Sequence, residues 1–143
     1  MHKATGNSGT RRLYIACYSG QDEIVKLLLA HEGLEVNQAK TDDSTAPLCI
    51  ACFKGHDEIV KLLLAQDGIE VNKARTDTGT TPLFMACQEG HNVVVKLLLA
   101  QDGIEVNKAR TDSGATPLNM ACQEGNDEIA KLLLAQDGIC LLY

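Results

Sequence analysis

The chain has very few aromatic residues. Among its 143 residues there is no tryptophan, and two phenylalanines and three tyrosines make up an aromatic share of 3%. Hydrophobic residues still account for 45% and charged residues for 22%, a balance typical of a folded chain and not of a disordered one. We therefore expect a core built from aliphatic and small side chains.

Long apolar runs are also missing. The longest runs are only a few residues, such as residues 97–100, whereas a membrane-spanning helix needs about 20. The opening segment MHKATGNSGTRR lacks the apolar stretch of a secretory signal. These absences predict no membrane partner and a location inside the cell, in the cytoplasm or the nucleus.

The chain has no surplus of positive charge. It carries 13 Lys and Arg against 19 Asp and Glu, which gives a net charge of −6 and a pI near 5.1. Binding to the phosphates of nucleic acids requires a surplus of basic residues. Nucleic acid is therefore not an expected partner.

What the sequence does contain is an internal repeat. The segment QDGIEVNKARTD stands at 66–77 and again at 101–112, a shift of 35 residues. The same shift separates Pro47, Pro82 and Pro117. Four cysteines and four glycines recur with the same shift. We expect one domain spanning residues 1–143, with repeats at 6–40, 41–75, 76–110 and 111–143.

Each repeat predicts two helices followed by a loop. In residues 76–110, Thr81 and Pro82 favour a helix start, and Gly90 favours a helix end. A second helix is predicted from His91 to about Gln101, then a brief extended stretch at 104–106 and a polar turn. This second helix is apolar on nearly all sides, so neighbouring repeats must cover it. The repeats are therefore expected to stack into a solenoid with one continuous core.

The pattern T-P-L-x-x-A-C-x-x-G-H-x-x-V-V-K-L-L-L closely resembles the ankyrin repeat over residues 6–143. The resemblance implies an all-α solenoid of helix-turn-helix units with extended β-turn loops. It also implies a non-enzymatic module without a cofactor, which binds a protein or peptide in a concave groove of turn tips and first helices. Two departures are a period of 35 residues instead of roughly 33, and Arg11-Arg12 where later repeats have Ala or Thr followed by Pro.

The positions at which the repeats differ are the candidate binding residues. They fall at the turn tips, including Ser8, at one position within the first helix, and at a pair of positions near its end. Tyr18 and Phe53 are the expected apolar anchors, although both could instead pack over neighbouring loops. The candidate set is Tyr14, Tyr18, Asp43, Phe53, Lys54, Thr78, Phe84, Gln88, Glu89, Ser113, Gln123 and Glu124.

The sequence offers little for catalysis or metal binding. It contains no G-x-S-x-G, no P-loop and no Gly-rich dinucleotide turn, so we predict no enzymatic activity. Cys49 and Cys52 form a C-x-x-C motif, with His56 nearby, that could bind zinc or carry redox chemistry. The alternative, which we favour, is that Cys52 belongs with Cys17 and Cys87 to a buried column of reduced thiols.

Two other sets of polar residues recur at fixed places. His56 and His91 follow the glycine that ends a first helix, where Gln21 and Asn126 stand in the other repeats, and each is expected to form hydrogen bonds at a helix start. A second set is expected to stabilise the loops: Asn37, Asn72 and Asn107.

The last repeat keeps an apolar second helix and adds Leu141 and Leu142. Solenoids usually need a polar cap at each end. We therefore expect a monomer whose tail folds back as a cap, with weak self-association through the C-terminal end as the alternative. Two other functions compete with partner binding: a designed or recently duplicated scaffold without a specific partner, suggested by the near-identity of the repeats, and a thiol or metal-binding protein.

Overall fold

The computed structural model describes residues 4–31, 34–39 and 44–141, and only the backbone of residues 4–10. Its described residues form eight helices in four consecutive pairs and no strand, which confirms the predicted all-α class. The helices are α1 (Ala4–Ser19), α2 (Asp22–Leu29), α3 (Pro47–Lys54), α4 (Asp57–Leu64), α5 (Pro82–Glu89), α6 (Asn92–Leu99), α7 (Pro117–Glu124) and α8 (Asp127–Leu134).

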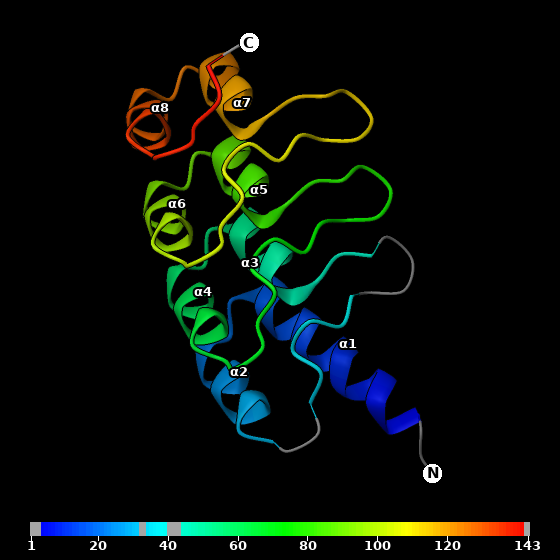
Figure 1. Ribbon diagram of the computed structural model, residues 1–143. Helices are drawn as coiled ribbons and strands as arrows, with labels where there is room; N and C mark the ends of the chain where they lie inside the picture. The colour runs from blue at the N-terminus through cyan, green and yellow to red at the C-terminus, as the bar shows by residue number, and fades with distance from the viewer. Residues whose placement is uncertain (1–3, 32–33, 40–43, 142–143) are drawn as a thin grey trace.

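The four pairs stack side by side. The first helices α1, α3, α5 and α7 form one layer, and the second helices α2, α4, α6 and α8 form the other, with loops extending away from the first layer (Figure 1). Each helix contacts the equivalent helix of the neighbouring pair, so the architecture is the predicted solenoid. Within the described part of the chain, the helices are too short or too polar to cross a membrane.

The starts and ends of the first helices follow the sequence signals. At the start of α5, Thr81 Oγ1 accepts a hydrogen bond from the backbone N–H of Phe84 at 3.1 Å. Thr116 and Asn119 exchange two such bonds at the start of α7 and so form a capping box. Gly90 ends α5 with a φ of 74°, a left-handed conformation that favours glycine.

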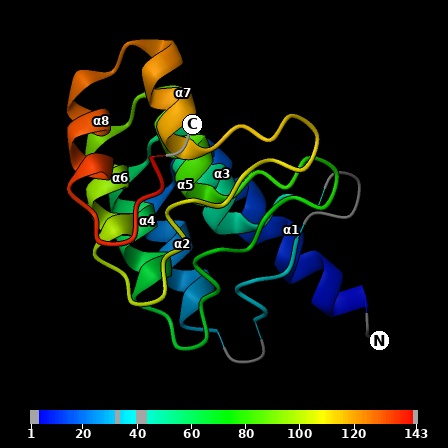
Figure 2. The ribbon, with the colours of Figure 1, turned by 45° about the horizontal axis from the view of Figure 1, so that its top comes forward.

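Helix α1 is an exception. It begins at Ala4 and spans 16 residues, whereas each later first helix begins at its proline and spans eight. Proline lacks a backbone N–H and clashes with a preceding helical turn, so it fixes where a helix begins. Arg12 stands at that place in the first repeat and does not stop the helix. The expectation that Ser8 lies at a turn tip is therefore wrong: it lies within α1, whose first half extends in the same direction as the loops (Figure 2).

The second helices end slightly earlier than predicted. Helix α6 ends at Leu99, with Ala100 as its C-cap, and not near Gln101. The Gln101 side chain instead donates from Nε2 to the carbonyl of Leu97 at 3.2 Å. The expected extended stretch at 104–106 is brief, because Val106 already belongs to the following turn.

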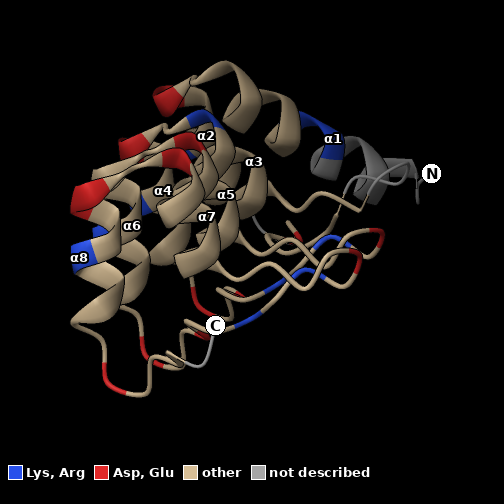
Figure 3. Ribbon diagram, turned by 90° about the horizontal axis from the view of Figure 1, so that it is seen from above, with Lys and Arg blue, Asp and Glu red and all other residues tan. Residues whose placement is uncertain are grey.

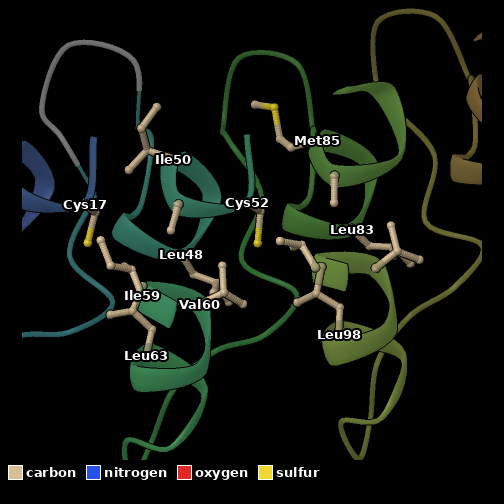
Figure 4. Packing of buried hydrophobic residues seen from close by; sticks show 14 of the residues in the cluster. Cys17, Leu48, Ile50, Cys52, Ile59, Val60, Leu63, Leu83, Met85 and Leu98 are labelled. Carbon is tan, nitrogen blue, oxygen red and sulfur yellow. The ribbon is translucent and has the colours of Figure 1, made fainter. Parts of the chain in front are cut away.

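The core runs through all four repeats and is almost entirely aliphatic. Cys17, Cys52 and Cys87 are completely buried within it, and Figure 4 shows the first two at equivalent places one repeat apart. This confirms the predicted column of buried thiols. The small size of these cysteine side chains lets consecutive first helices approach closely. Leu, Ile and Val side chains fill the space between the first and the second helices.

Asparagine side chains connect each loop to the next repeat. Asn37 donates from Nδ2 to the carbonyl of Gly68 and accepts from the backbone N–H of Glu70, both at 2.8 Å. Asn72 and Asn107 form the equivalent two bonds one and two repeats further on. The predicted loop-stabilising role is confirmed, and it acts between repeats.

The histidines have a different role from the one expected. His56 and His91 occupy the N-cap positions of α4 and α6, but neither side chain caps its own helix. Each Nε2 instead lies close to a backbone carbonyl in the first helix of the preceding repeat. His56 Nε2 is 3.2 Å from the carbonyl oxygen of Tyr18, and His91 Nε2 is 3.0 Å from that of Phe53. The imidazole is long enough to reach the neighbouring repeat. Only the shorter Asn126 is a side-chain cap, accepting from the N–H of Ile129 at 3.1 Å, and Gln21 is not.

The described part of the C-terminal tail, which ends at Leu141, does not cover the last helix as expected. Leu141 is 68% exposed and is therefore not packed as a cap over α8. Cys140 is held instead through its backbone N–H, which donates to Oδ1 of Asn107 at 2.8 Å. Leu142 lies outside the described residues.

Candidate functional site

The residues that vary between repeats lie at one largely buried first-helix position and in two further rows. Because the first helices lie side by side, residues at equivalent positions line up across the stack (Figure 1). The turn-tip row consists of Thr78 and Ser113 among the described residues, since Asp43 lies outside them. The helix-end row consists of Tyr18, Phe53, Lys54, Gln88, Glu89, Gln123 and Glu124.

Most of the helix-end row faces solvent. The Tyr18 side chain is 49% exposed, and Lys54, Glu89 and both residues of the last repeat are also exposed. Phe53 and Gln88 are half-buried, and Phe53 packs against the edge of the core. The row therefore offers three different pairs of side chains across four copies of one repeated backbone.

An aromatic and basic cluster lies at the N-terminal end of this row. The rings of Tyr14 and Tyr18 stack with their centroids 6.4 Å apart and an interplanar angle of 30°. Lys54 extends from α3 and places its Nζ 4.6 Å from the centroid of the Tyr18 ring. A cation–π contact of this kind is worth about 0.5–1 kcal/mol at an exposed site. The contact orders Tyr18 before any partner binds, which lowers the entropy lost on binding.

The other end of the row is polar and acidic. Gln88 donates from Nε2 to the carboxylate of Glu89 at 3.1 Å, and Glu124 is exposed one repeat further on. Asp127 and Glu128 follow directly in the first turn of α8, where negative charge interacts favourably with the helix dipole. Acidic residues also begin α2 and α4 (Figure 3), so the difference between the two ends lies in the helix-end row itself. The helix-end row therefore changes in charge from one end to the other.

Phe84 does not belong to the exposed surface, and the expectation that it contacts a partner directly is wrong. Its side chain is completely buried. The guanidinium of Arg110, from the loop that follows α6, lies 5.7 Å from the centroid of its ring. Cys49 at the equivalent place is also buried, with its thiol donating to the carbonyl of Thr80. This position packs beneath the next loop, and Tyr14 at the same place is half-buried.

The turn tips are held to one another by hydrogen bonds. The backbone carbonyl of Thr78 accepts a hydrogen bond from the backbone N–H of Thr111 in the next loop at 2.8 Å. The Thr78 hydroxyl is hydrogen-bonded to the hydroxyl of Thr80. Ser113 is exposed, and its Oγ accepts from the N–H of Ala115 at 3.3 Å. Thr78 is only half-buried, so both described tips still offer polar surface.

Ion pairs that the sequence reasoning missed stiffen the same loops. Arg75 pairs with Asp77 at 2.6 Å, and Arg110 pairs with Asp112 at the equivalent place. The side-chain hydrogen bond from Arg75 lowers the pKa of Asp77 to about 2, and Arg110 likewise lowers that of Asp112. The signal was present in the sequence as an Arg-Thr-Asp triplet in two repeats.

The cysteine motif is part of the core. Cys49 and Cys52 are both completely buried, and Cys49 Sγ donates to the carbonyl of Lys73 at 3.5 Å. Burial raises the pKa of Cys17 and Cys87 to about 12, so these groups are neutral thiols at physiological pH. No group of three or more His, Cys, Asp or Glu is arranged to hold a metal ion in the regions that the structure describes.

Comparison with known proteins identifies one match. A family model described as ankyrin repeats (3 copies) matches residues 2–75 and again residues 70–141. No curated protein matches the chain significantly. The two matched segments together include all eight helices and both rows of variable residues.

Proposed function

Because the chain belongs to the ankyrin repeat family, whose members generally mediate protein–protein interactions, we propose that it binds a partner protein or peptide through the helix-end row and the turn-tip row. The observation that carries the proposal is Tyr18, which is half-exposed on a rigid helix and held by Lys54 from the neighbouring repeat. Large aromatic side chains in such ordered settings supply much of the binding energy of interfaces.

The repeats themselves separate scaffold from binding surface. The Leu, Ala, Cys and Gly of the first helix are the same in every repeat, whereas the helix-end pair reads Tyr-Ser, Phe-Lys, Gln-Glu and Gln-Glu. Change at exposed positions on an otherwise constant backbone supports a role in recognition. A scaffold without a specific partner has no need of an ordered aromatic at such a place.

The chemistry of the row indicates the kind of partner. Tyr18 and the exposed part of Phe53 suit an apolar side chain, and the ammonium of Lys54 suits a nearby carboxylate. Glu89 and Glu124 suit basic residues at the other end. We therefore propose a partner segment with an apolar and acidic part followed by a basic part, lying across the first helices from α1 to α7.

Three further features belong to the same proposal. The four repeats at 6–40, 41–75, 76–110 and 111–143 act as one domain, since one core runs through all of them. The protein has no enzymatic activity, as is typical of the family, and its partners are neither nucleic acid nor membrane. It acts inside the cell, in the cytoplasm or the nucleus, where its buried thiols suit a reducing compartment.

The proposal is tested by capturing partners on the immobilised chain and then measuring their affinity for purified variants. Tyr18→Ala removes the aromatic anchor, and we expect the dissociation constant to rise about tenfold or more, equivalent to at least about 1.4 kcal/mol. Val93→Ala is the matched control, because Val93 is 47% exposed but lies on the second helix α6, outside both rows. Equal affinity of the wild type and Tyr18→Ala for a purified partner contradicts the assignment.

Charge at the acidic end gives a second test. Glu89→Lys leaves the buried core untouched, because Glu89 is exposed. We expect it to weaken binding of the same partner, with a larger effect at low than at high salt, because salt screens charges at a surface. A salt-independent effect, or none, contradicts the proposed direction of the partner segment.

A further inference from the structure

The first repeat exposes apolar residues whose equivalents in the later repeats are buried or half-buried. Ile24 is 47% exposed, whereas its equivalents Ile59, Val94 and Ile129 are completely buried. The equivalent in the last repeat is buried although no described helix pair follows it. The cover over this position therefore comes from the preceding repeat.

Two further residues are also more exposed than their equivalents. Leu27 is 71% exposed, whereas its equivalents Leu62, Leu97 and Leu132 are half-buried. Ile15 is 53% exposed, whereas Ile50 and Met85 are buried and Met120 is half-buried. All three exposed residues lie on α1 and α2. We call Ile15, Ile24 and Leu27 the N-terminal end face.

The last repeat shows the opposite pattern. Cys122 is exposed, whereas Cys17, Cys52 and Cys87 are completely buried. Cys17 is buried although no repeat precedes it in the structure. The residues that bury this position therefore come from the following repeat. Two more residues share the pattern, being more exposed than their equivalents in earlier repeats, and with Cys122 they define the C-terminal end face: Leu118, Cys122 and Leu134.

These faces are the two halves of an interface that already exists within the stack. The same kinds of side chain meet where α3 and α4 pack on α1 and α2, and twice more along the chain. We propose that the C-terminal end face of one copy of this chain binds the N-terminal end face of a second copy, continuing the stack between molecules. The surface is separate from the helix-end row, so the proposal does not depend on partner binding.

The charges around the two faces favour this pairing over contact between like faces. The described part of α1 and α2 carries three basic residues and two acidic ones, Arg11, Arg12 and Lys26 against Asp22 and Glu23. Helices α7 and α8 carry one basic residue and three acidic ones, Lys131 against Glu124, Asp127 and Glu128. Opposite charges attract across an interface, whereas like faces would bring similar charges together.

Because the two faces differ, the association is head-to-tail. A head-to-tail contact leaves one free face at each end of a dimer, so further copies can add. The average mass of the particles should therefore rise continuously with concentration and pass the mass of a dimer.

The test is sedimentation velocity over a range of protein concentrations in a reducing buffer. Leu27→Glu places a charge in the N-terminal end face, and Cys122→Arg does so in the C-terminal one. Both residues are exposed in the single chain, so neither change disturbs its core. We expect each variant alone to remain at the 15.4 kDa of one chain. An equimolar mixture should form a one-to-one dimer and stop there, because it contains one intact face of each kind.

Val93→Glu is the matched control for a new charge at an exposed apolar position, since the other repeats have Glu there. It should associate like the wild type, and circular dichroism should show the same helix content for all variants. A wild type that stays monomeric at every concentration overturns the proposal. So does a dimer abolished by Leu27→Glu but unaffected by Cys122→Arg, or the reverse, because these outcomes indicate contact between like faces.

Discussion

Gly55 is predicted to be essential for contact between the second and third repeats, and Gly55→Ala tests this. The residue ends α3 with a φ of 72°. A Cβ atom added there would come within 2.5 Å of the imidazole of His91, closer than real Cβ atoms approach a neighbour. The ring could give way only by leaving its position 3.0 Å from the carbonyl of Phe53.

Two terms set the size of the effect. A non-glycine residue in the left-handed region costs roughly 1–2 kcal/mol. Loss of the His91 hydrogen bond between repeats adds about 0.5–1.5 kcal/mol. We therefore expect Gly55→Ala to lower the free energy of unfolding by about 1.5–3.5 kcal/mol.

The other repeats supply a graded series at nearly the same φ. A Cβ added at Gly20 would lie 2.9 Å from the His56 side chain, and one added at Gly90 would lie 3.1 Å from the Asn126 side chain. A Cβ added at Gly125 would have no neighbouring atom within 4 Å. The loss of stability should decrease in that order, from Gly55 to Gly125. Only the term for the left-handed conformation should remain at Gly125.

Urea unfolding followed by circular dichroism measures these changes, because the chain has no tryptophan to report by fluorescence. The deciding comparison repeats Gly55→Ala in a His91→Ala background. There the clash is absent, and the loss should fall to roughly 1–2 kcal/mol, the conformational term alone. An equal loss in both backgrounds would refute the role of His91.

Further predictions concern the links between repeats and the thiols. Asn72→Ala removes two bonds to the next loop and should lower the free energy of unfolding by about 1–3 kcal/mol, with faster hydrogen exchange at the amide of Glu105 as the local readout. Cys122 should react with a thiol reagent in the folded protein, whereas Cys17 and Cys87 should react only after unfolding; equal rates would contradict their burial. Burial raises the pKa of these two thiols from 9.0 to about 12, so the unfolded chain ionises first, and stability should fall as pH rises from about 9 toward 12. Urea midpoints that do not change over that interval would contradict this.

The parts of the fold that the sequence predicted correctly depend on local or strictly repeated signals. Thr81 and Pro82 define a helix start, and Gly90 defines a helix end, whatever packs against them. The cysteines and the loop asparagines recur at one spacing, so a single structural role explains all three loop asparagines and the three buried cysteines Cys17, Cys52 and Cys87. The exposure of Tyr18 and Lys54 agrees with their place on a helical wheel.

The errors arise where a contact between residues far apart in the sequence decides the outcome. Phe84 is buried and has the guanidinium of Arg110, from the loop after α6, near its ring, and no local sequence pattern indicates that contact. His91 looks like a helix cap in sequence, yet its ring reaches the preceding repeat. Arg12 was recognised as a departure, but its consequence, a longer α1, required knowing that proline alone stops the helix there.

The central claim is that the protein binds a partner through the exposed residues that differ between repeats. The most direct test is titration calorimetry of a purified partner with the wild type, Tyr18→Ala and Val93→Ala. The account predicts a dissociation constant at least about tenfold higher for Tyr18→Ala and an unchanged one for Val93→Ala. Unchanged affinity for Tyr18→Ala, or equal losses in both variants, would contradict it.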